Sequence, residues 1–206
     1  MNIIKFFRRI KLRNKNITIF TNNCLAGFIY QRYGLKYLSP TIGINIEPEH
    51  FIKFCKNYKY YLSLDMEEAS DYNQDWFSSV GGGGINFPVG KLGDIYIYFQ
   101  HYNTFEEAKN IWDRRKQRIN PDNMYMILYD INPSIETFKK FETVDFAKKL
   151  YLYHKGEFIN SSLAFYIKNF DEKSGRGWWS RMNRFNPFSK KYFEQFNFTK
   201  WLNENC

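Results

Sequence analysis

The stretch "MYMILYD", residues 124–130, decides the fold, because it is an almost uninterrupted apolar run. A strand of this kind is typical of a parallel sheet that is covered on both faces. Helical spacing follows Thr104 before it and Ser134 after it, and a second strand pattern, "KKLYLYHK", occupies residues 148–155. Together with the strand-like run "DIYIYFQHYN" at 94–103, this order predicts a right-handed βαβαβ unit over residues 94–154.

The same pattern of strand followed by helix occurs nearer the N-terminus. "ITIF", residues 17–20, alternates like a strand, and the helical spacing that follows runs from Cys24 to Tyr33. Gly34 is a typical residue to end that helix. Pro48 suits the first position of a further helix.

These elements predict an α/β fold with a single three-layer domain, a mostly parallel sheet and helices on both faces. A basic N-terminal arm, residues 1–16, precedes the domain, which spans residues 17–206. From about residue 156 to residue 206 the pattern becomes irregular, aromatic and basic, with an edge strand and a short closing helix as its expected elements.

Composition places the chain among globular proteins of the cell interior. Its 206 residues are 44% apolar and 25% charged, and its three cysteines lack the spacing of a disulfide framework. The first residues lack the apolar segment of a secretory leader, and no apolar run is long enough to span a bilayer. We therefore expect a cytoplasmic protein.

The formal net charge of +9 favours an anionic partner. An anionic small molecule, such as a nucleotide-sugar or a sugar phosphate, fits this charge, as does an anionic membrane surface. The sequence carries no RNA-recognition, helix-turn-helix or zinc-finger pattern, so no specific nucleic acid is expected.

Two segments that mix basic and aromatic residues favour peripheral association with the inner face of the membrane. They are residues 1–13, which include "KFFRRIKLR", and residues 176–193. Alternating basic and bulky apolar residues can form a short amphipathic helix on a membrane surface. The other interpretation of the first segment is an arm that only improves solubility.

Common cofactor and metal signatures are missing from the sequence. The four glycines at 81–84 match neither a dinucleotide-binding fingerprint nor a Walker loop, so they indicate a surface loop or a flexible lid. "LDMEE" and "SDYNQD" do not contain the DxD motif of metal-dependent glycosyltransferases. We expect no cofactor and no metal.

Polar residues follow each predicted strand at its carboxyl end. In a parallel sheet these ends share one edge, where open α/β folds hold their ligands. The residues expected at this edge are Asn22, Asn23, Cys24, His101, Tyr102, Asn103, Asp130, Asn132 and His154. The sequence therefore predicts a polar crevice there, with two histidines at matching positions on neighbouring strands.

Three functional hypotheses compete for this crevice. In the first, Cys24 at a helix N-terminus is a nucleophile, His101 is its base and Asp130 orients His101. In the second, His101, Asp130 and His154 bind a metal, although their spacing matches no ligand signature. A purely structural interpretation also remains, in which an asparagine caps the helix and Cys24 packs as a small apolar residue.

The third hypothesis is the one we favour. Asn22, Asn23 and the helix N-terminus hold a phosphate or sugar hydroxyls, and His101 and Asp130 act as general acid or base. In this arrangement Asn22 and Asn23 face the crevice and Cys24 turns inward, because its following neighbours are apolar. Ser39 and His154 are further candidates for substrate binding.

Arg115 is a candidate for binding an anionic ligand. It lies three residues after Trp112, so the two side chains share one face of a helix. The alternative is a tryptophan in the core with the arginine extending over it.

The residues above resemble a bacterial family, domain of unknown function 1919. The resemblance rests on N-N-C-x-x-G-x-x-Y, then S-P-T, then F-x-H-Y with W-x-x-R behind it, and on "FIKFCKNYKYYL", "FPVGKLGD" and the closing "KWLN". It covers most of residues 17–155. The matching positions are Asn22, Asn23, Cys24, Gly27, Tyr30, Ser39, Pro40, His101, Trp112 and Arg115.

The resemblance implies a compact α/β fold and a role in cell-surface polysaccharide biosynthesis. Some members carry the label exopolysaccharide biosynthesis protein and look like companions of glycosyltransferases. The expected function is therefore a transferase or modifying enzyme that acts on a sugar or a nucleotide-sugar. The alternative is a non-catalytic sugar- or phosphate-binding module, or a scaffold, that works with glycosyltransferases. The family brings no established reaction, so no catalytic role is carried over from it.

Overall fold

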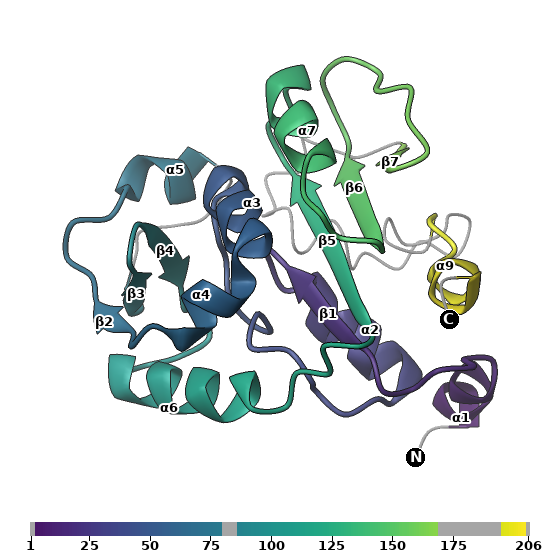
Figure 1. Cartoon of the computed structure of the whole chain (residues 1–206), viewed down its shortest axis with the longest axis horizontal. Helices are drawn as coiled ribbons and strands as arrows, with labels where there is room; N and C mark the ends of the chain where they lie inside the picture. The colour runs from purple at the N-terminus through teal and green to yellow at the C-terminus, as the bar shows by residue number, and fades with distance from the viewer. Residues whose placement is uncertain (1–2, 80–85, 169–194, 205–206) are drawn as a thin grey trace.

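The computed structural model of the chain describes residues 3–79, 86–168 and 195–204 (Figure 1). The glycines at 81–84, the basic and aromatic segment 176–193 and Cys206 lie outside the described residues. The interpretations made of them therefore stay predictions.

The centre of the fold is the parallel sheet that the sequence predicts. It contains β1 (Thr18–Thr21), β5 (Met124–Asp130), β6 (Lys149–Tyr153) and β7 (Ala164–Tyr166) in the order β1-β5-β6-β7. Each neighbouring pair is parallel. The apolar run at 124–130 is the interior strand β5, and the edge strand expected after residue 156 is β7.

Helices cover both faces of this sheet, as predicted. Because side chains alternate along a strand, Tyr125 and Ile127 of β5 lie on one face, and Met126 and Leu128 lie on the other. The first face packs against α2 (Leu25–Tyr33) and α9 (Phe198–Glu204). The second packs against α3 (Pro48–Lys56), α4 (Tyr58–Ser63) and α7 (Ile135–Glu142). The prediction of a three-layer α/β fold is confirmed.

A second, antiparallel sheet lies on the far side of α3 and α4 (Figure 1). It contains β2 (Glu67–Glu68), β3 (Val89–Leu92) and β4 (Ile95–Tyr98) in the order β2-β3-β4. The prediction that the strand at 94–100 belongs to the parallel sheet is therefore wrong, and only the part of the βαβαβ unit from β5 through α7 to β6 exists.

The reason for this difference is a tight hairpin. Gly93 and Asp94 form the two-residue connection between β3 and β4, and Gly93 has a φ of 60°. A glycine in the left-handed region is favoured in such turns, because it has no Cβ to clash. β4 pairs with β3 on one edge, and on its other edge Tyr98 forms a bridge with Asn45, so β4 does not pair with β5, the strand that follows α6 (Phe105–Lys116).

The predicted helix boundaries are confirmed where a capping residue marks them. Thr104 Oγ1 accepts the N–H of Glu107 at 3.2 Å, and Ser134 Oγ accepts the N–H of Thr137 at 3.0 Å. Gly34 ends α2 with a φ of 61°. A short helix, α5 (Gln74–Ser79), lies beside the antiparallel sheet (Figure 1).

The basic N-terminal residues include a helix, α1 (Ile3–Ile10), which packs on α2. Arg9 Nη1 donates to the carbonyl of Gly34 at 2.9 Å. Asn203 of α9 accepts the N–H of Arg13 at 2.9 Å and donates to the carbonyl of Lys11 at 2.7 Å. The two bonds of Asn203 hold α9 beside the segment that follows α1 (Figure 1).

Candidate functional site

A crevice opens between the carboxyl ends of β1 and β5. After β1 the chain passes into α2 on one face of the sheet, and after β5 it passes into α7 on the opposite face. Where connections from adjacent parallel strands leave in opposite directions, the strand ends are left uncovered, and ligands bind there. The predicted crevice is therefore present, at β1 and β5.

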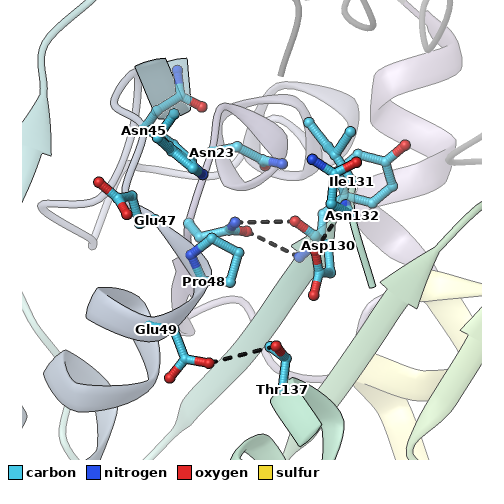
Figure 2. Close-up of a pocket in the computed structure, with 12 residues that line it drawn as sticks. Asn23, Asn45, Glu47, Pro48, Glu49, Asp130, Ile131, Asn132 and Thr137 are labelled. Atoms are coloured by element: carbon cyan, nitrogen blue, oxygen red, sulfur yellow. Dashed lines mark hydrogen bonds between the residues drawn. The ribbon is translucent and has the colours of Figure 1, made fainter. Parts of the chain in front are cut away.

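A cavity of about 210 Å³ lies in this crevice. One wall is the end of β5 with Tyr129, Asp130, Ile131 and Asn132, and the opposite wall is the start of α3 with Glu47, Pro48 and Glu49 (Figure 2). Asn22, Asn23, Asn45, Trp76 and Thr137 complete the lining.

Asn22 lines the cavity, and its side chain extends the parallel sheet. Its Nδ2 donates to the carbonyl of Tyr129 at 3.0 Å, and its Oδ1 accepts the N–H of Tyr129 at 2.9 Å. The amide thus replaces the next peptide group of β1 in its pairing with β5. The backbone carbonyl of Asn22 accepts the N–H of Ile46 at 2.8 Å, which fixes the segment before α3 beside β1.

The turn between β1 and α2 satisfies the first N–H groups of α2 internally. Asn23 Oδ1 accepts the N–H of Leu25 at 3.0 Å, and Thr21 Oγ1 accepts the N–H of Ala26 at 3.3 Å. These donors would otherwise be the ones that hold a phosphate at a helix N-terminus. Because these N–H groups are already bonded, they are not available to a phosphate, and the hypothesis of a phosphate at this helix end is weakened.

Asp130 is the buried carboxylate of the cavity. Its Oδ2 accepts the hydroxyl of Tyr151 at 2.7 Å, and its Oδ1 accepts the N–H of Asn132 at 3.0 Å. Burial raises the pKa of Asp130, although these two hydrogen bonds oppose the shift. A carboxyl group with a raised pKa is suited to act as a general acid or base near neutral pH.

Two glutamates bring further negative charge to the same cavity. Burial raises the pKa of Glu47, and the hydroxyl of Tyr98, which donates to Glu47 Oε1 at 3.1 Å, opposes the shift. Glu49 is closer to solvent and pairs with Lys140 Nζ at 3.2 Å. The dashed line in Figure 2 marks its longer contact with Thr137. An anionic ligand is therefore disfavoured inside this cavity, despite the positive net charge of the chain.

The remaining lining suits a polyhydroxylated ligand. Asn23, Asn45 and Asn132 offer amide groups. Trp76 offers an aromatic ring that packs on Tyr98 with 5.1 Å between ring centroids. Carboxylates accept hydrogen bonds from hydroxyls, and amides both accept and donate them. An indole provides a flat apolar surface for the C–H face of a sugar ring.

The metal hypothesis is not supported by the part of the chain that the structure describes. Among those residues, no three His, Cys, Asp or Glu side chains are close enough together to hold a metal ion. His154 is buried and its Nδ1 lies 2.8 Å from the hydroxyl of Tyr129. His101 belongs to the loop after β4, in the other sheet, so the two histidines do not occupy matching positions on neighbouring strands.

Cys24 and His101 do come together. The distance between Cys24 Sγ and His101 Nε2 is 3.2 Å, and Gln100 Nε2 lies 3.0 Å from the same sulfur. The predicted inward position of Cys24 agrees with its 5% exposed fraction, but the sulfur has polar neighbours. Asp130 bonds to Tyr151 and Asn132 instead of to His101, so the structure provides a pair without the predicted orienting carboxylate.

The other predicted binding residues support the site from outside. Ser39 is fully buried, and its hydroxyl lies 3.0 Å from that of Thr41, which in turn accepts the N–H of Thr21 at 3.0 Å. Arg115 Nη1 donates to the carbonyl of Ile42 at 2.7 Å and to the hydroxyl of Tyr102 at 3.0 Å. Ser39, Arg115 and His154 are therefore not part of the cavity lining.

Sequence reasoning did not identify the residues that reach the cavity from other parts of the fold. These are Asn45, Glu47, Glu49, Trp76 and Thr137. The one local signal was Pro48 at the first turn of α3, because it places Glu47 and Glu49 around a helix start. Gln100 was likewise overlooked, although it directly precedes His101.

Comparisons with known proteins extend over nearly the whole chain. A family model described as Domain of unknown function (DUF1919) matches residues 1–203. A protein of Haemophilus influenzae, which bears the name "Uncharacterized protein", is 28% identical over 194 residues. The alignment covers 94% of this chain and 87% of that relative.

Proposed function

The chain belongs to the family described as Domain of unknown function (DUF1919), and from this premise we propose that it is a sugar-modifying enzyme of cell-surface polysaccharide assembly. In this proposal the cavity between β1 and β5 binds a neutral sugar, and the enzyme transfers a group to or from one of its hydroxyls.

The observation that carries the proposal is the composition of the cavity wall. Three carboxylates, four asparagine side chains and one indole line the same small cavity. A site built to bond hydroxyl groups rejects ligands without them, because its own buried polar groups would then be left unpaired. The carboxylates direct a neutral sugar ring into the cavity and keep the phosphates of a nucleotide-sugar outside it.

Asp130 is the residue to which we assign general acid or base catalysis. It lies at the end of a rigid, buried strand and is fixed by Tyr151 and Asn132. Because its pKa is raised, Asp130 holds a proton at pH values closer to neutral than an ordinary aspartate does. Glu47 is the second carboxylate with a raised pKa in the same cavity.

A non-catalytic scaffold is the alternative function, and two observations favour it. Ser39 and His154 are buried and bonded within the fold, while apolar side chains of α1 are exposed. Asp130, in contrast, lines a cavity together with Asn22 and Asn23, which is the arrangement expected of an enzyme. We therefore retain the enzyme as the proposal.

The test is a thermal-shift screen with neutral hexoses, amino sugars, uronic acids and nucleotide-sugars, and with inorganic phosphate and free nucleotide as controls. A ligand at 100 times its Kd stabilises the native state by about 2.7 kcal/mol. We expect neutral or amino sugars to raise the Tm and phosphate to leave it unchanged. A Tm that rises with phosphate or free nucleotide, and with no sugar, would contradict the proposal.

We also propose that α1 attaches the protein to an anionic membrane. Phe6, Phe7 and Ile10 have exposed fractions of 44%, 59% and 59%, and Arg8 and Arg9 lie on the same short helix. Arg9 is held by the carbonyl of Gly34, which leaves Arg8 to pair with anionic headgroups. Apolar side chains that enter the lipid interface beside such a basic residue give reversible binding. No helix in the described part of the chain is long and apolar enough to cross a bilayer.

Replacing Phe6 and Phe7 together by serine is expected to lower the partition of the protein into anionic vesicles at least about tenfold. Burying one phenylalanine contributes about 1.5–3 kcal/mol, and 1.4 kcal/mol corresponds to a factor of ten. Co-sedimentation with vesicles measures the partition. Phe158→Ser is the matched control, because Phe158 is 76% exposed outside α1. Equal partition of the double variant and the control would contradict the membrane role of α1.

A further inference from the structure

The side chains of Cys24, His101 and Gln100 form a polar group beside the cavity that the proposed function does not use. We propose that this group is a second reactive site, in which Cys24 accepts an acyl group from an activated ester or thioester. This proposal rests on the geometry of the three side chains and does not require that the cavity bind a sugar.

The first argument is the contact between a nucleophile and a base. Cys24 Sγ and His101 Nε2 are 3.2 Å apart, which allows the thiol to donate its proton to the unprotonated imidazole nitrogen. Burial raises the pKa of Cys24 to about 11, and burial also lowers the pKa of His101. Near neutral pH the pair therefore rests as a neutral thiol beside a neutral imidazole, and the base acts when the sulfur attacks.

The second argument is the amide of Gln100. Its Nε2 lies 3.0 Å from Cys24 Sγ and 3.3 Å from His101 Nε2. A carbonyl carbon that bonds to this sulfur carries its oxygen within reach of the same N–H donor. Donors placed where negative charge develops on that oxygen are the main source of catalysis in acyl transfer.

Cys55 provides a comparison within the same protein. It is 2% exposed, it lies in the apolar cluster between the two sheets, and burial alone raises its pKa. Cys55 is thus a cysteine that only packs. Cys24 is buried to a similar degree, but two side-chain nitrogens approach its sulfur.

The surroundings favour acyl transfer over phosphoryl transfer. Phosphoryl transfer depends on cations that clamp the transferred group. Arg115 approaches this region, but its Nη1 donates to Ile42 and Tyr102. The N–H groups of Leu25 and Ala26 at the start of α2 are bonded within the turn.

The reaction balances in two steps. In the first, the Cys24 proton passes to His101 Nε2, the sulfur bonds to the acyl carbon, and the bond from that carbon to the leaving group breaks. The leaving alcohol or thiol takes the proton from His101. In the second, an acceptor hydroxyl gives its proton to His101 and attacks the thioester, and the C–S bond breaks. The leaving sulfur then takes the proton from His101, which restores the Cys24 thiol and the neutral imidazole. Water serves as the acceptor when no other hydroxyl is bound.

Cys24 directly follows Asn23, which lines the cavity. If the proposed function holds, a hydroxyl of the bound sugar is the natural acceptor, and the protein is an acyltransferase that modifies a surface polysaccharide. This assignment of the acceptor depends on the proposed function, whereas formation of the acyl-enzyme does not.

The experiment uses the full chain, p-nitrophenyl acetate as the acyl donor, and no sugar. Peptide mass mapping at successive times measures how fast each cysteine acquires an acetyl group. We expect Cys24 to be acetylated before Cys55, and His101→Ala to lower the rate at Cys24 at least about 100-fold, as for the loss of a general base. His50→Ala is the matched control and should leave the rate unchanged.

His101 lies in the loop after β4 and is partly exposed to solvent, so its variant is expected to fold, and thermal unfolding of each variant verifies this. Acetylation of Cys24 no faster than that of Cys55, or at the same rate in His101→Ala and wild type, would overturn the proposal. Because the assay contains no sugar, a failure here is distinct from a failure of the cavity to bind sugars.

Discussion

Replacement of Asn22 by leucine is expected to lower the free energy of unfolding by about 2–6 kcal/mol, because it leaves two buried backbone groups without partners. The N–H and the carbonyl of Tyr129 both bond to the Asn22 amide, and Tyr129 is 1% exposed. Each buried group left unpaired costs about 1–3 kcal/mol. Urea unfolding measures the loss.

Asn132→Leu is the matched control for this experiment. Asn132 also lines the cavity, but its side chain is exposed and only its backbone N–H bonds to Asp130. We expect its replacement to change the free energy of unfolding by no more than about 0.5 kcal/mol. A cost below about 1 kcal/mol for Asn22→Leu would contradict the structural role of Asn22.

Asp130→Asn is expected to lower the rate of reaction on the bound sugar by about 10²–10⁴-fold, which is the contribution of a general acid or base. The measurement compares turnover of wild type and variant with the sugar that the thermal-shift screen identifies. Asp94→Asn, in which the aspartate lies at the surface and pairs with Lys53, is the control with an unchanged rate. Equal turnover of Asp130→Asn and wild type would remove Asp130 from the mechanism.

The raised pKa of Asp130 also predicts how the stability of Asp130→Asn, relative to wild type, changes with pH. Burial raises this pKa in the folded state above its unfolded value of about 3.9. The wild type therefore loses stability as the pH rises through the raised pKa, because the buried carboxyl must ionise. Asparagine does not ionise, so the variant should gain stability relative to wild type as the pH rises from about 4 to about 7. Thermal unfolding at a series of pH values tests this, and a relative loss over the same range would contradict it.

The elements that the sequence predicted correctly are those whose signals are local. The apolar run of β5, the caps Thr104 and Ser134, and the terminating Gly34 each act within a few residues. Gly34 and Pro48 needed no tertiary information, because the missing Cβ of glycine and the ring of proline set their backbone preferences locally.

The alternation of residues in β4 does not by itself predict which strand β4 pairs with. Its alternation matches a strand of either sheet, and the Gly93–Asp94 hairpin decides the choice. His101 nevertheless reaches Cys24, because Ile46 bonds to Asn22 and Asn45 pairs with Tyr98. These pairings bring the end of β4 beside the end of β1 without a shared sheet.

The candidate site was predictable in position but only partly in composition. Asn22, Asn23 and Asp130 follow directly from the rule that ligands bind at the carboxyl ends of parallel strands. Glu47 and Trp76 come from segments whose place is set by tertiary packing. The structural role of Asn22 depends on Tyr129, which lies 107 residues later in the chain.

The most direct test of the proposed sugar site is an experimental structure of the protein crystallised with the neutral or amino sugar that raises its Tm most. We predict that the sugar ring lies in the cavity, with hydroxyls bonded to Asp130 and Asn23 and with one face against Trp76. A sugar bound elsewhere on the protein, with this cavity left to solvent, would contradict the account.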